Sequence, residues 1–160
     1  MTDIVQIYCD GSCYPNPGGI GGWGYAAYDV DGTELHYDSG ALPCATNNTA
    51  EMAAMLHALQ WAGQWAARIH TDSMYVVNGL NKWAYGWARN GWMRKEQGRR
   101  VEIPNAEVWR LLVQARRPIH EVVWVRGHNG TRGNERADHL AGAARLEFAK
   151  QQEVQHGCPQ

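Results

Sequence analysis

The chain has 160 residues, of which 44% are hydrophobic, and its formal net charge is −1. This length corresponds to one domain with enough apolar residues for a core, and no apolar run reaches the ~18 residues of a membrane span. Segment 1–6 has neither a basic start nor a long apolar stretch, so we expect no signal peptide.

The four cysteines lack the paired CxxC spacing of zinc sites; they are Cys9, Cys13, Cys44 and Cys158. We therefore expect neither a zinc site nor a disulfide framework. Idle thiols of this kind are typical of the reducing cytoplasm, which is the location that we expect for the protein.

Charge is unevenly distributed along the chain. Segment 82–100 holds six basic residues and one acidic residue, so it carries +5 and leaves −6 on the remainder. Three tryptophans, Trp83, Trp87 and Trp92, are interleaved with these basic residues. A polyanion could bind to this basic segment and react on the acidic remainder.

The first half of the chain predicts three strands and a helix. Alternation over 4–9 predicts a strand, and two more strands are predicted over 23–29 and 33–39, joined by an Asp-Gly hairpin signal. The Gly- and Pro-rich segment 11–24 predicts a turn-rich connection.

A long helix is then expected over 49–65. Asn48 is its predicted N-cap, and Glu51 lies three residues on, as in a capping box. The apolar stripe of this helix consists of Met52, Met55, Leu56 and Leu59.

The second half predicts a further alternation of strands and helices. The expected elements are a strand over 68–71, short helices over 73–80 and 81–88, an exposed basic loop over 89–103, a helix over 104–116, a strand over 119–125, a flexible loop over 127–133 and a final helix over 134–148. In helix 104–116, the residues expected to face inward are Val108, Leu111 and Leu112.

This order of elements predicts an α/β fold. We expect one five-stranded mixed sheet, with three antiparallel strands and then two parallel ones, flanked by helices. One domain is expected over 1–148, followed by a polar C-terminal tail over 149–160.

Four acidic residues stand in separate segments of the chain: Asp10, Glu51, Asp72 and Asp138. Alone, each has an ordinary explanation, as a turn residue, a capping-box residue, a helix start or a solvated helix residue. Together they fit a site, because Asp10 and Asp72 end predicted strands, where α/β proteins form their sites. Glu51 lies in the first turn of a helix, where a carboxylate is stabilised.

Carboxylates that are brought together repel one another unless divalent cations neutralise them. Their oxygens are hard ligands, and Mg²⁺ is the usual partner in phosphate chemistry. If the fold gathers these four acids, we expect an enzyme that cuts phosphodiesters.

Six segments match one known family in order and spacing: YCDGSC (8–13), TNN (46–48), TDSMYV (71–76), WAYGWARNGW (83–92), RGHNG (126–130) and NERAD (134–138). They closely resemble type 1 ribonuclease H, and the resemblance covers about 4–146. It implies a ribonuclease H-like fold with 1–148 as the catalytic domain. It also implies an endonuclease that cuts the RNA strand of RNA/DNA hybrids and leaves 5′-phosphate and 3′-hydroxyl ends.

The resemblance further implies two Mg²⁺ ions, for which Mn²⁺ can substitute. Its motifs assign Asp10, Glu51, Asp72 and Asp138 as the metal ligands, with Asp10 bridging the two ions. Two ions about 3.5–4 Å apart can clamp an in-line displacement at phosphorus.

His128 lies in an irregular Gly-rich loop and, from that loop alone, would be a solvent histidine. The resemblance assigns it proton transfer or assistance to product departure, which an imidazole can perform near neutral pH. We expect it to be helpful but not indispensable.

RNA is distinguished from DNA by contacts to 2′-hydroxyls. Glu51 could accept such a bond as well as bind metal, and Met74 is expected to lie against the minor groove. The other residues expected to contact the RNA strand are Gly11, Ser12, Cys13, Asn16, Asn47 and Asn48.

Trp83 and Trp87 are spaced i, i+4 and so share a helix face, for which core packing is the ordinary explanation. Together with the surrounding cations they could instead form a groove for the DNA strand, and the resemblance supports this. The other residues expected to contact the DNA strand are Thr46, Arg89, Arg94 and Lys95.

Two features depart from the family pattern. The basic loop over 93–104 differs from that of relatives, and Thr49 stands where many bacterial relatives carry Arg. These departures affect the contacts to the DNA strand and leave the acidic set complete.

Three other functions are considered. A hybrid-binding module without catalysis would lack at least one of the four acids, and none is missing. An integrase or transposase core would lack the basic segment and the Gly-His-Asn-Gly loop. A detached domain of a reverse transcriptase is the third; the plausible initiator Met favours a free-standing enzyme, which we expect to be a monomer.

Overall fold

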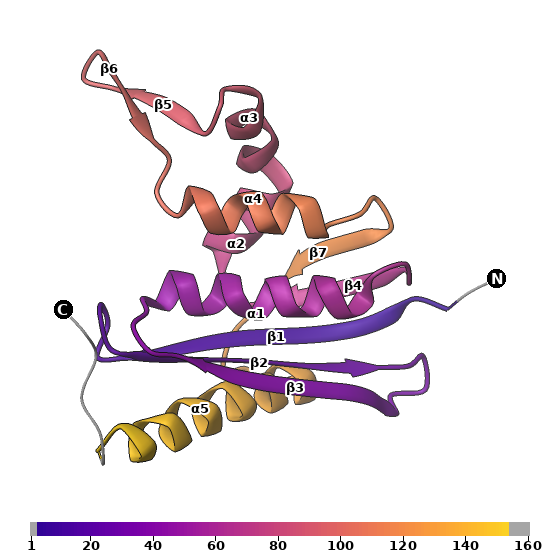
Figure 1. Cartoon of the computed structure of the whole chain (residues 1–160). Coiled ribbons are helices and arrows are strands. Elements are labelled where there is room, and N and C mark those ends of the chain that lie inside the picture. The colour runs from indigo at the N-terminus through magenta and orange to yellow at the C-terminus, as the bar shows by residue number, and fades with distance from the viewer. Residues whose placement is uncertain (1–2, 154–160) are drawn as a thin grey trace.

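The computed structural model of the protein describes residues 3–153. Its centre is a mixed sheet with the strand order β3-β2-β1-β4-β7 (Figure 1). The strands are β1 (Val5–Tyr14), β2 (Ile20–Tyr28), β3 (Glu34–Leu42), β4 (Ala67–Thr71) and β7 (His120–Trp124). The first three strands pair antiparallel, whereas β4 pairs parallel with both β1 and β7, so the predicted five-stranded sheet is confirmed.

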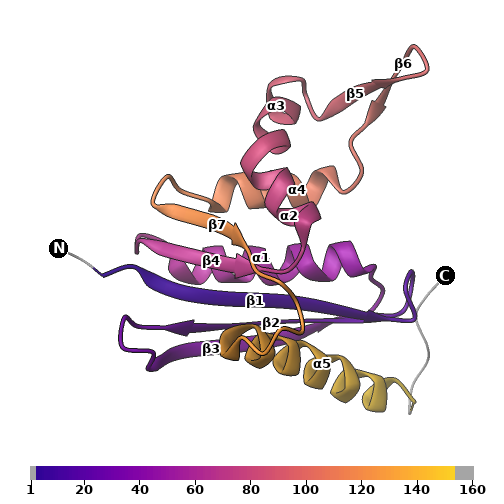
Figure 2. The same cartoon turned by 180° about the vertical axis from the view of Figure 1, so that it is seen from behind.

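Helices cover both faces of the sheet. Helix α1 (Asn47–Ala62) packs on one face with α4 (Ala106–Ala115) above it, and α5 (Arg132–Glu153) covers the other face (Figures 1 and 2). Three short helical segments follow β4: α2 (Met74–Asn78), the π-helical turn η1 (Gly79–Trp83) and α3 (Ala84–Arg89). Within the described part of the chain, no helix combines the length and apolar character needed to cross a membrane.

Most of the predicted connection over 11–24 is strand. β1 runs to Tyr14 and β2 resumes at Ile20, so only a short turn separates them. The glycines of this region serve close packing: a Cβ on Gly11 would overlap the backbone of α1, and one on Gly22 would overlap the Ala141 carbonyl of α5. Glycine within a strand often marks such a close approach of another element. In the sequence, these glycines were indistinguishable from those of turns, so the strands were predicted too short.

Helix α1 is capped differently from the prediction. Thr46 is the N-cap, and its hydroxyl accepts a hydrogen bond from the Thr49 N–H at 3.0 Å, while the Thr49 hydroxyl accepts one from the Thr46 N–H at 2.8 Å. Asn48 is therefore not the N-cap, and Glu51 is not the capping-box residue, because its carboxylate turns toward β1 instead. The apolar stripe is confirmed by the side chains of Met52, Met55 and Leu59, which are buried, and Leu56, which is partly buried.

The segment over 89–103 is not the irregular loop that the sequence predicted. It forms a hairpin of β5 (Met93–Glu96) and β6 (Arg99–Glu102), which projects away from the sheet (Figure 1). Its turn, Gln97-Gly98, has φ angles of 52° and 79°, the left-handed pair typical of a two-residue hairpin turn. Both strands are short and mostly exposed, so no hydrophobic alternation marks them in the sequence.

Two helices also differ from expectation. In α4 the buried side chains include Trp109 and Leu112, whereas Leu111 is 47% exposed, because the helix turns its Trp109 face onto Gly79. Helix α5 continues to Glu153, past its predicted end at Phe148. Residues 154–160 of the expected polar tail lie outside the described residues.

Two of the cysteines agree with the sequence-based expectation. Cys9 and Cys13 are buried free thiols. Cys44 is disulfide-bonded, so the expectation of idle thiols is wrong at this position, because spacing along the chain does not reveal which residues approach in space. The prediction for Cys158 lies outside the described residues.

The contact between Gly22 and α5 yields a stability prediction. We expect Gly22→Ala to lower the free energy of unfolding by about 1–3 kcal/mol, because its methyl group would force α5 away from β2. Gly142→Ala is the matched control, because Gly142 lies in α5 itself and a Cβ there would meet open space. Alanine is the better helix former, so this variant should raise the free energy of unfolding by up to ~1 kcal/mol. Urea denaturation of both variants checks this, and an unchanged midpoint for Gly22→Ala would contradict it.

Candidate active site

The four acidic residues meet at one pocket. Asp10 lies on β1, Glu51 on α1 and Asp72 directly after β4, and one carboxylate oxygen from each lies within 4.8 Å of the others. Asp138 on α5 lines the same pocket, whose volume is about 400 Å³. The spatial prediction from the sequence, that separate segments bring these acids together, therefore holds for all four.

The topology explains this convergence. β1 and β4 are parallel neighbours, so Asp10 and Asp72 lie toward the same edge of the sheet. Gly11 lets α1 approach β1 closely, and its N–H donates to the Glu51 carboxylate and to Asp10 Oδ1, the latter at 2.9 Å. The Thr71 hydroxyl donates to Glu51 Oε2 at 3.4 Å.

Ionisation of both Asp10 and Glu51 is unfavourable in the metal-free pocket, because both side chains are buried. Asp10 is 5% exposed and Glu51 8% exposed. The pKa of Asp10 is raised to about 7, chiefly by burial; the hydrogen bond with Glu51 lowers it, and the charges of Asp72 and Asp138 raise it. Burial, and then the adjacent Asp10, hold the pKa of Glu51 well above its ordinary value.

The pocket has the donor set of a hard-cation site. None of the ion pairs formed among residues 3–153 includes any of the four acids. Their oxygens are therefore left to a cation from solution, and an all-carboxylate set suits Mg²⁺ or Mn²⁺ rather than a soft metal. The residues present thus fit a divalent metal centre.

His128 reaches the pocket from the loop between β7 and α5. It lines the pocket together with the acids, although its side chain is exposed. Its backbone is left-handed, with φ 54°, a conformation uncommon for a residue other than glycine. An exposed imidazole beside buried carboxylates can exchange protons with both solvent and a bound molecule.

The residues expected at the RNA strand surround the pocket mouth. Its lining includes Gly11, Ser12, Cys13, Asn47 and Asn48, together with Ser73, which the sequence analysis missed although it belongs to the Thr-Asp-Ser motif.

The side chains of two residues expected at the RNA strand, Asn16 and Cys13, make contacts within the protein. Asn16 does not line the pocket; its Oδ1 accepts from the Asn47 N–H at 2.9 Å. The Cys13 thiol is buried and donates to the Pro15 and Ala45 carbonyls at 3.3 and 3.4 Å, so its sulfur is engaged within the protein. Met74 is 48% exposed at the start of α2 and lines neither this pocket nor the groove described next.

A second cavity of about 350 Å³ lies beside the first. Asn48 lines both, so the two are adjoining. Three of its lining residues were expected at the DNA strand, namely Trp83, Trp87 and Arg94. We call it the tryptophan groove.

Sequence analysis missed other residues of the tryptophan groove: Tyr75, Ile103, Pro104 and Asn105. Asn105 Nδ2 donates to the Tyr75 hydroxyl at 3.2 Å. The available signal was the Asn after Pro104, which adopts a left-handed φ of 60° where α4 begins.

The other residues expected at the DNA strand lie outside the tryptophan groove. Arg89 ends α3, and Lys95 is on the exposed hairpin. Thr46 caps α1 and lines a separate shallow pocket with Thr49.

The fold and the pocket define an α/β protein whose acidic site suits divalent cations. The model of the RNase H family matches residues 2–145. The chain therefore belongs to the ribonuclease H family, which confirms the resemblance seen in its motifs.

Relatives and solved structures agree. A ribonuclease H of Cyanothece sp. is 42% identical over 145 residues, which are 89% of this chain and 89% of that protein. One of Parvibaculum lavamentivorans is 43% identical, over 87% of this chain and 90% of that protein. The crystal structure of LC9-RNase H1, described as a type 1 RNase H with the type 2 active-site motif, has a TM-score of 0.78 and 30% identity, covering 92% of this chain and 74% of that chain. LC11-RNase H1 in complex with an RNA/DNA hybrid has a TM-score of 0.67 and 25% identity, covering 91% and 99%.

The raised pKa of Asp10 makes the stability of the metal-free protein depend on pH. Between its ordinary value of 3.8 and about 7, the unfolded chain loses this proton before the folded one does, so the free energy of unfolding falls as pH rises. At pH 8 in EDTA the penalty is complete. Asp10→Asn should then stabilise the protein by up to about 4 kcal/mol, or roughly 8–16 °C in Tm, and by much less at pH 4.

Thermal melts at the two pH values in EDTA measure this effect. Asp31→Asn serves as the control, because Asp31 is an exposed acid in the turn after β2. If both variants shift Tm equally at pH 8, burial and repulsion of Asp10 within the pocket are not the cause.

Proposed function

We propose that this protein hydrolyses the RNA strand of RNA/DNA hybrids and leaves 5′-phosphate and 3′-hydroxyl ends. The observation that carries the proposal is the convergence of Asp10, Glu51, Asp72 and Asp138, from four elements, on one pocket. Membership of the ribonuclease H family and the adjoining tryptophan groove support it.

In this proposal the four acids hold two Mg²⁺ ions, for which Mn²⁺ can substitute. Asp10 would be the central ligand, because it is buried on the central strand β1 among the other acids. When bound, the ions lower the pKa of the attacking water and stabilise the charge that develops on the leaving oxygen. The carboxylates hold the ions in place. Without the ions, the negative charge of the carboxylates would repel the phosphates of a nucleic acid.

The chain's own residues orient the substrate. Asn47 and Asn48 at the start of α1, with Ser12 and the backbone of Gly11 and Cys13, face 2′-hydroxyls of the RNA strand. On the other side, flat rings of Trp83 and Trp87 receive deoxyribose, and Arg94 receives a phosphate. The remaining substrate-binding residues proposed are Asn16, Thr46, Met74, Arg89 and Lys95.

His128 is the proton carrier of the proposed reaction. The 3′ oxygen gains negative charge as its bond to phosphorus breaks, and a protonated imidazole can neutralise it. The exposed loop allows the ring to exchange its proton with solvent between turnovers.

Three further properties accompany the proposal. Residues 1–148 form the catalytic domain, the enzyme is a monomer, and it works in the cytoplasm. The buried free thiols of Cys9 and Cys13 fit a reducing compartment, whereas the disulfide at Cys44 does not argue for one.

Incubation with four substrates tests the function directly. In Mg²⁺ the enzyme should cut the RNA strand of a hybrid and leave double-stranded RNA, single-stranded RNA and duplex DNA intact, and EDTA should stop the reaction. Asp10→Asn should reduce cleavage to background while the protein stays folded, since the substitution removes a ligand charge at nearly constant shape. Binding of hybrid without cutting would indicate a binding module, and cutting of duplex DNA an integrase-like nuclease.

His128→Ala should lower kcat by about 100-fold or less, with little change in KM, because proton transfer accelerates departure without holding the substrate. Steady-state rates on a hybrid over pH 6–9 give the measurement. Loss of all activity would instead make His128 indispensable and contradict the proposed role.

A further inference from the structure

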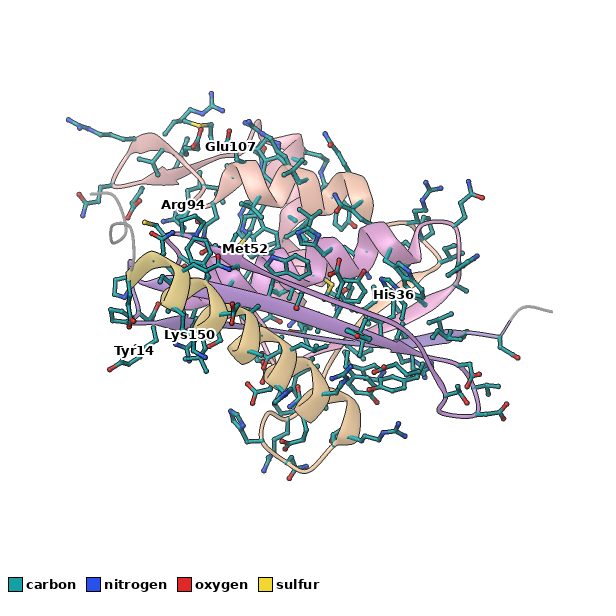
Figure 3. The ribbon with its side chains drawn as sticks, turned by 60° about the horizontal axis from the view of Figure 1, so that its bottom comes forward. Tyr14, His36, Met52, Arg94, Glu107 and Lys150 are labelled. Atoms are coloured by element: carbon teal, nitrogen blue, oxygen red, sulfur yellow. The ribbon has the colours of Figure 1, made fainter. Side chains whose placement is uncertain are left out.

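Arg145 on α5 lies beside the acidic pocket and is not part of the catalytic set. It is seven residues beyond Asp138, so it is on the same side of the helix and about 10 Å further along its axis. Its Nε donates to Ser12 Oγ at 3.2 Å, and its guanidinium carbon is 5.9 Å from the centre of the Tyr14 ring. Figure 3 labels Tyr14 at the end of the molecule where the C-terminal half of α5 lies, which is marked by Lys150.

The pairing of β1 with β2 explains this placement. Asp10, Ser12 and Tyr14 alternate along β1, so their side chains lie on one face of the sheet. The strand partner of Ser12 is Gly22, which packs against Ala141 and Arg145, so this is the face that α5 covers. Arg145 therefore extends a line that starts at Asp10 in the pocket and follows β1 outward.

The guanidinium has unused donors. Arginine has five N–H groups, and among the described residues Arg145 makes a hydrogen bond only through Nε. It takes part in none of the ion pairs formed within residues 3–153. Both terminal nitrogens are thus available for the bidentate contact that arginine makes with a phosphate.

The same hydrogen bond sets the role of Ser12. A serine hydroxyl has one donor and two acceptor positions, and Arg145 occupies an acceptor position. The hydroxyl hydrogen is left to donate toward the pocket that Ser12 lines. An RNA strand offers acceptors there, as phosphate and 2′-hydroxyl oxygens.

We propose that Arg145 binds a phosphate of the RNA strand next to the scissile one, and that it orients the Ser12 hydroxyl as a donor to the same strand. This inference rests on the proposed hybrid cleavage and extends the RNA contacts from β1 onto α5. The competing explanation is that Arg145 only packs α5 against Tyr14.

Kinetics of Arg145→Gln on a hybrid separate these explanations. The variant should raise KM about 10-fold, as for loss of a charged hydrogen bond, and leave kcat nearly unchanged. The dependence of log KM on log salt concentration should become less steep by about 0.7–0.9, as for one lost phosphate contact. Arg145→Lys should recover the salt dependence but only part of the affinity, because it keeps the charge and loses the planar fork.

Arg117→Gln is the matched control. It removes the same charge from an exposed residue that precedes β7, at the end of this strand opposite to the pocket. Its KM and salt dependence should equal those of the unaltered enzyme. If both variants change the salt dependence alike, the effect is long-range charge and the proposal is overturned.

A neutral methylphosphonate, moved singly along the RNA strand, locates the contact. At one position the methylphosphonate should weaken hybrid binding by the unaltered enzyme as much as Arg145→Gln does. At that position it should not weaken binding by the variant any further. Additive losses at every position, or a lower Tm for Arg145→Gln with unchanged KM, would assign a packing role only.

The failure of this inference can be distinguished from failure of the proposed function. Fluorescence anisotropy with a labelled hybrid in Ca²⁺ measures binding without requiring turnover. Hybrid binding that Arg145→Gln weakens would support the contact even if the enzyme did not cut. Cleavage by the unaltered enzyme with equal binding by the variant would overturn the contact and leave the function standing.

Discussion

The site depends on one constraint, the cost of burying carboxylates and holding them next to one another. Burial raises the pKa of both Asp10 and Glu51, so the pocket opposes its own assembly. Close backbone packing on the two faces of the sheet opposes this, at Gly11 of β1 against α1 and at Gly22 of β2 against α5. The acids can be brought together because the helices that carry two of them are fixed by apolar contacts elsewhere.

Stability and substrate contact occupy different parts of the molecule. The large core lies between the sheet, α1 and α4, and its fully buried side chains include Met52, Leu59 and Trp109. The hairpin of β5 and β6 contributes little to it, since nearly all of its residues are exposed. Segments with few buried contacts unfold locally at a low cost in free energy. The hairpin can therefore change its conformation against a duplex without displacing the four acids.

The sequence predicted the mixed five-stranded sheet and the four acids because each leaves a local mark: alternation, a turn signal or a short motif. It could not decide the cap of α1, because the Asn48 and Glu51 pair satisfies the capping pattern as well as Thr46 and Thr49 do. Only the structure shows that β1 lies next to α1 and that the Glu51 carboxylate bonds to the Gly11 N–H of β1 instead of capping the helix. The contact from Arg145 to Ser12 joins residues 133 positions apart and has no local signature.

Discrimination between duplexes follows from having two different surfaces side by side. Under the proposed function, a strand with 2′-hydroxyls on the tryptophan groove would place these groups against Trp83 and Trp87, which offer little hydrogen bonding through their ring faces. A strand without them at the acidic pocket would leave Asn48 and Ser12 short of partners. Each unpaired polar group costs about 1–3 kcal/mol when water is excluded. Double-stranded RNA therefore fails on one side and duplex DNA on the other, and only a hybrid satisfies both surfaces in the orientation that brings its RNA strand to the acids.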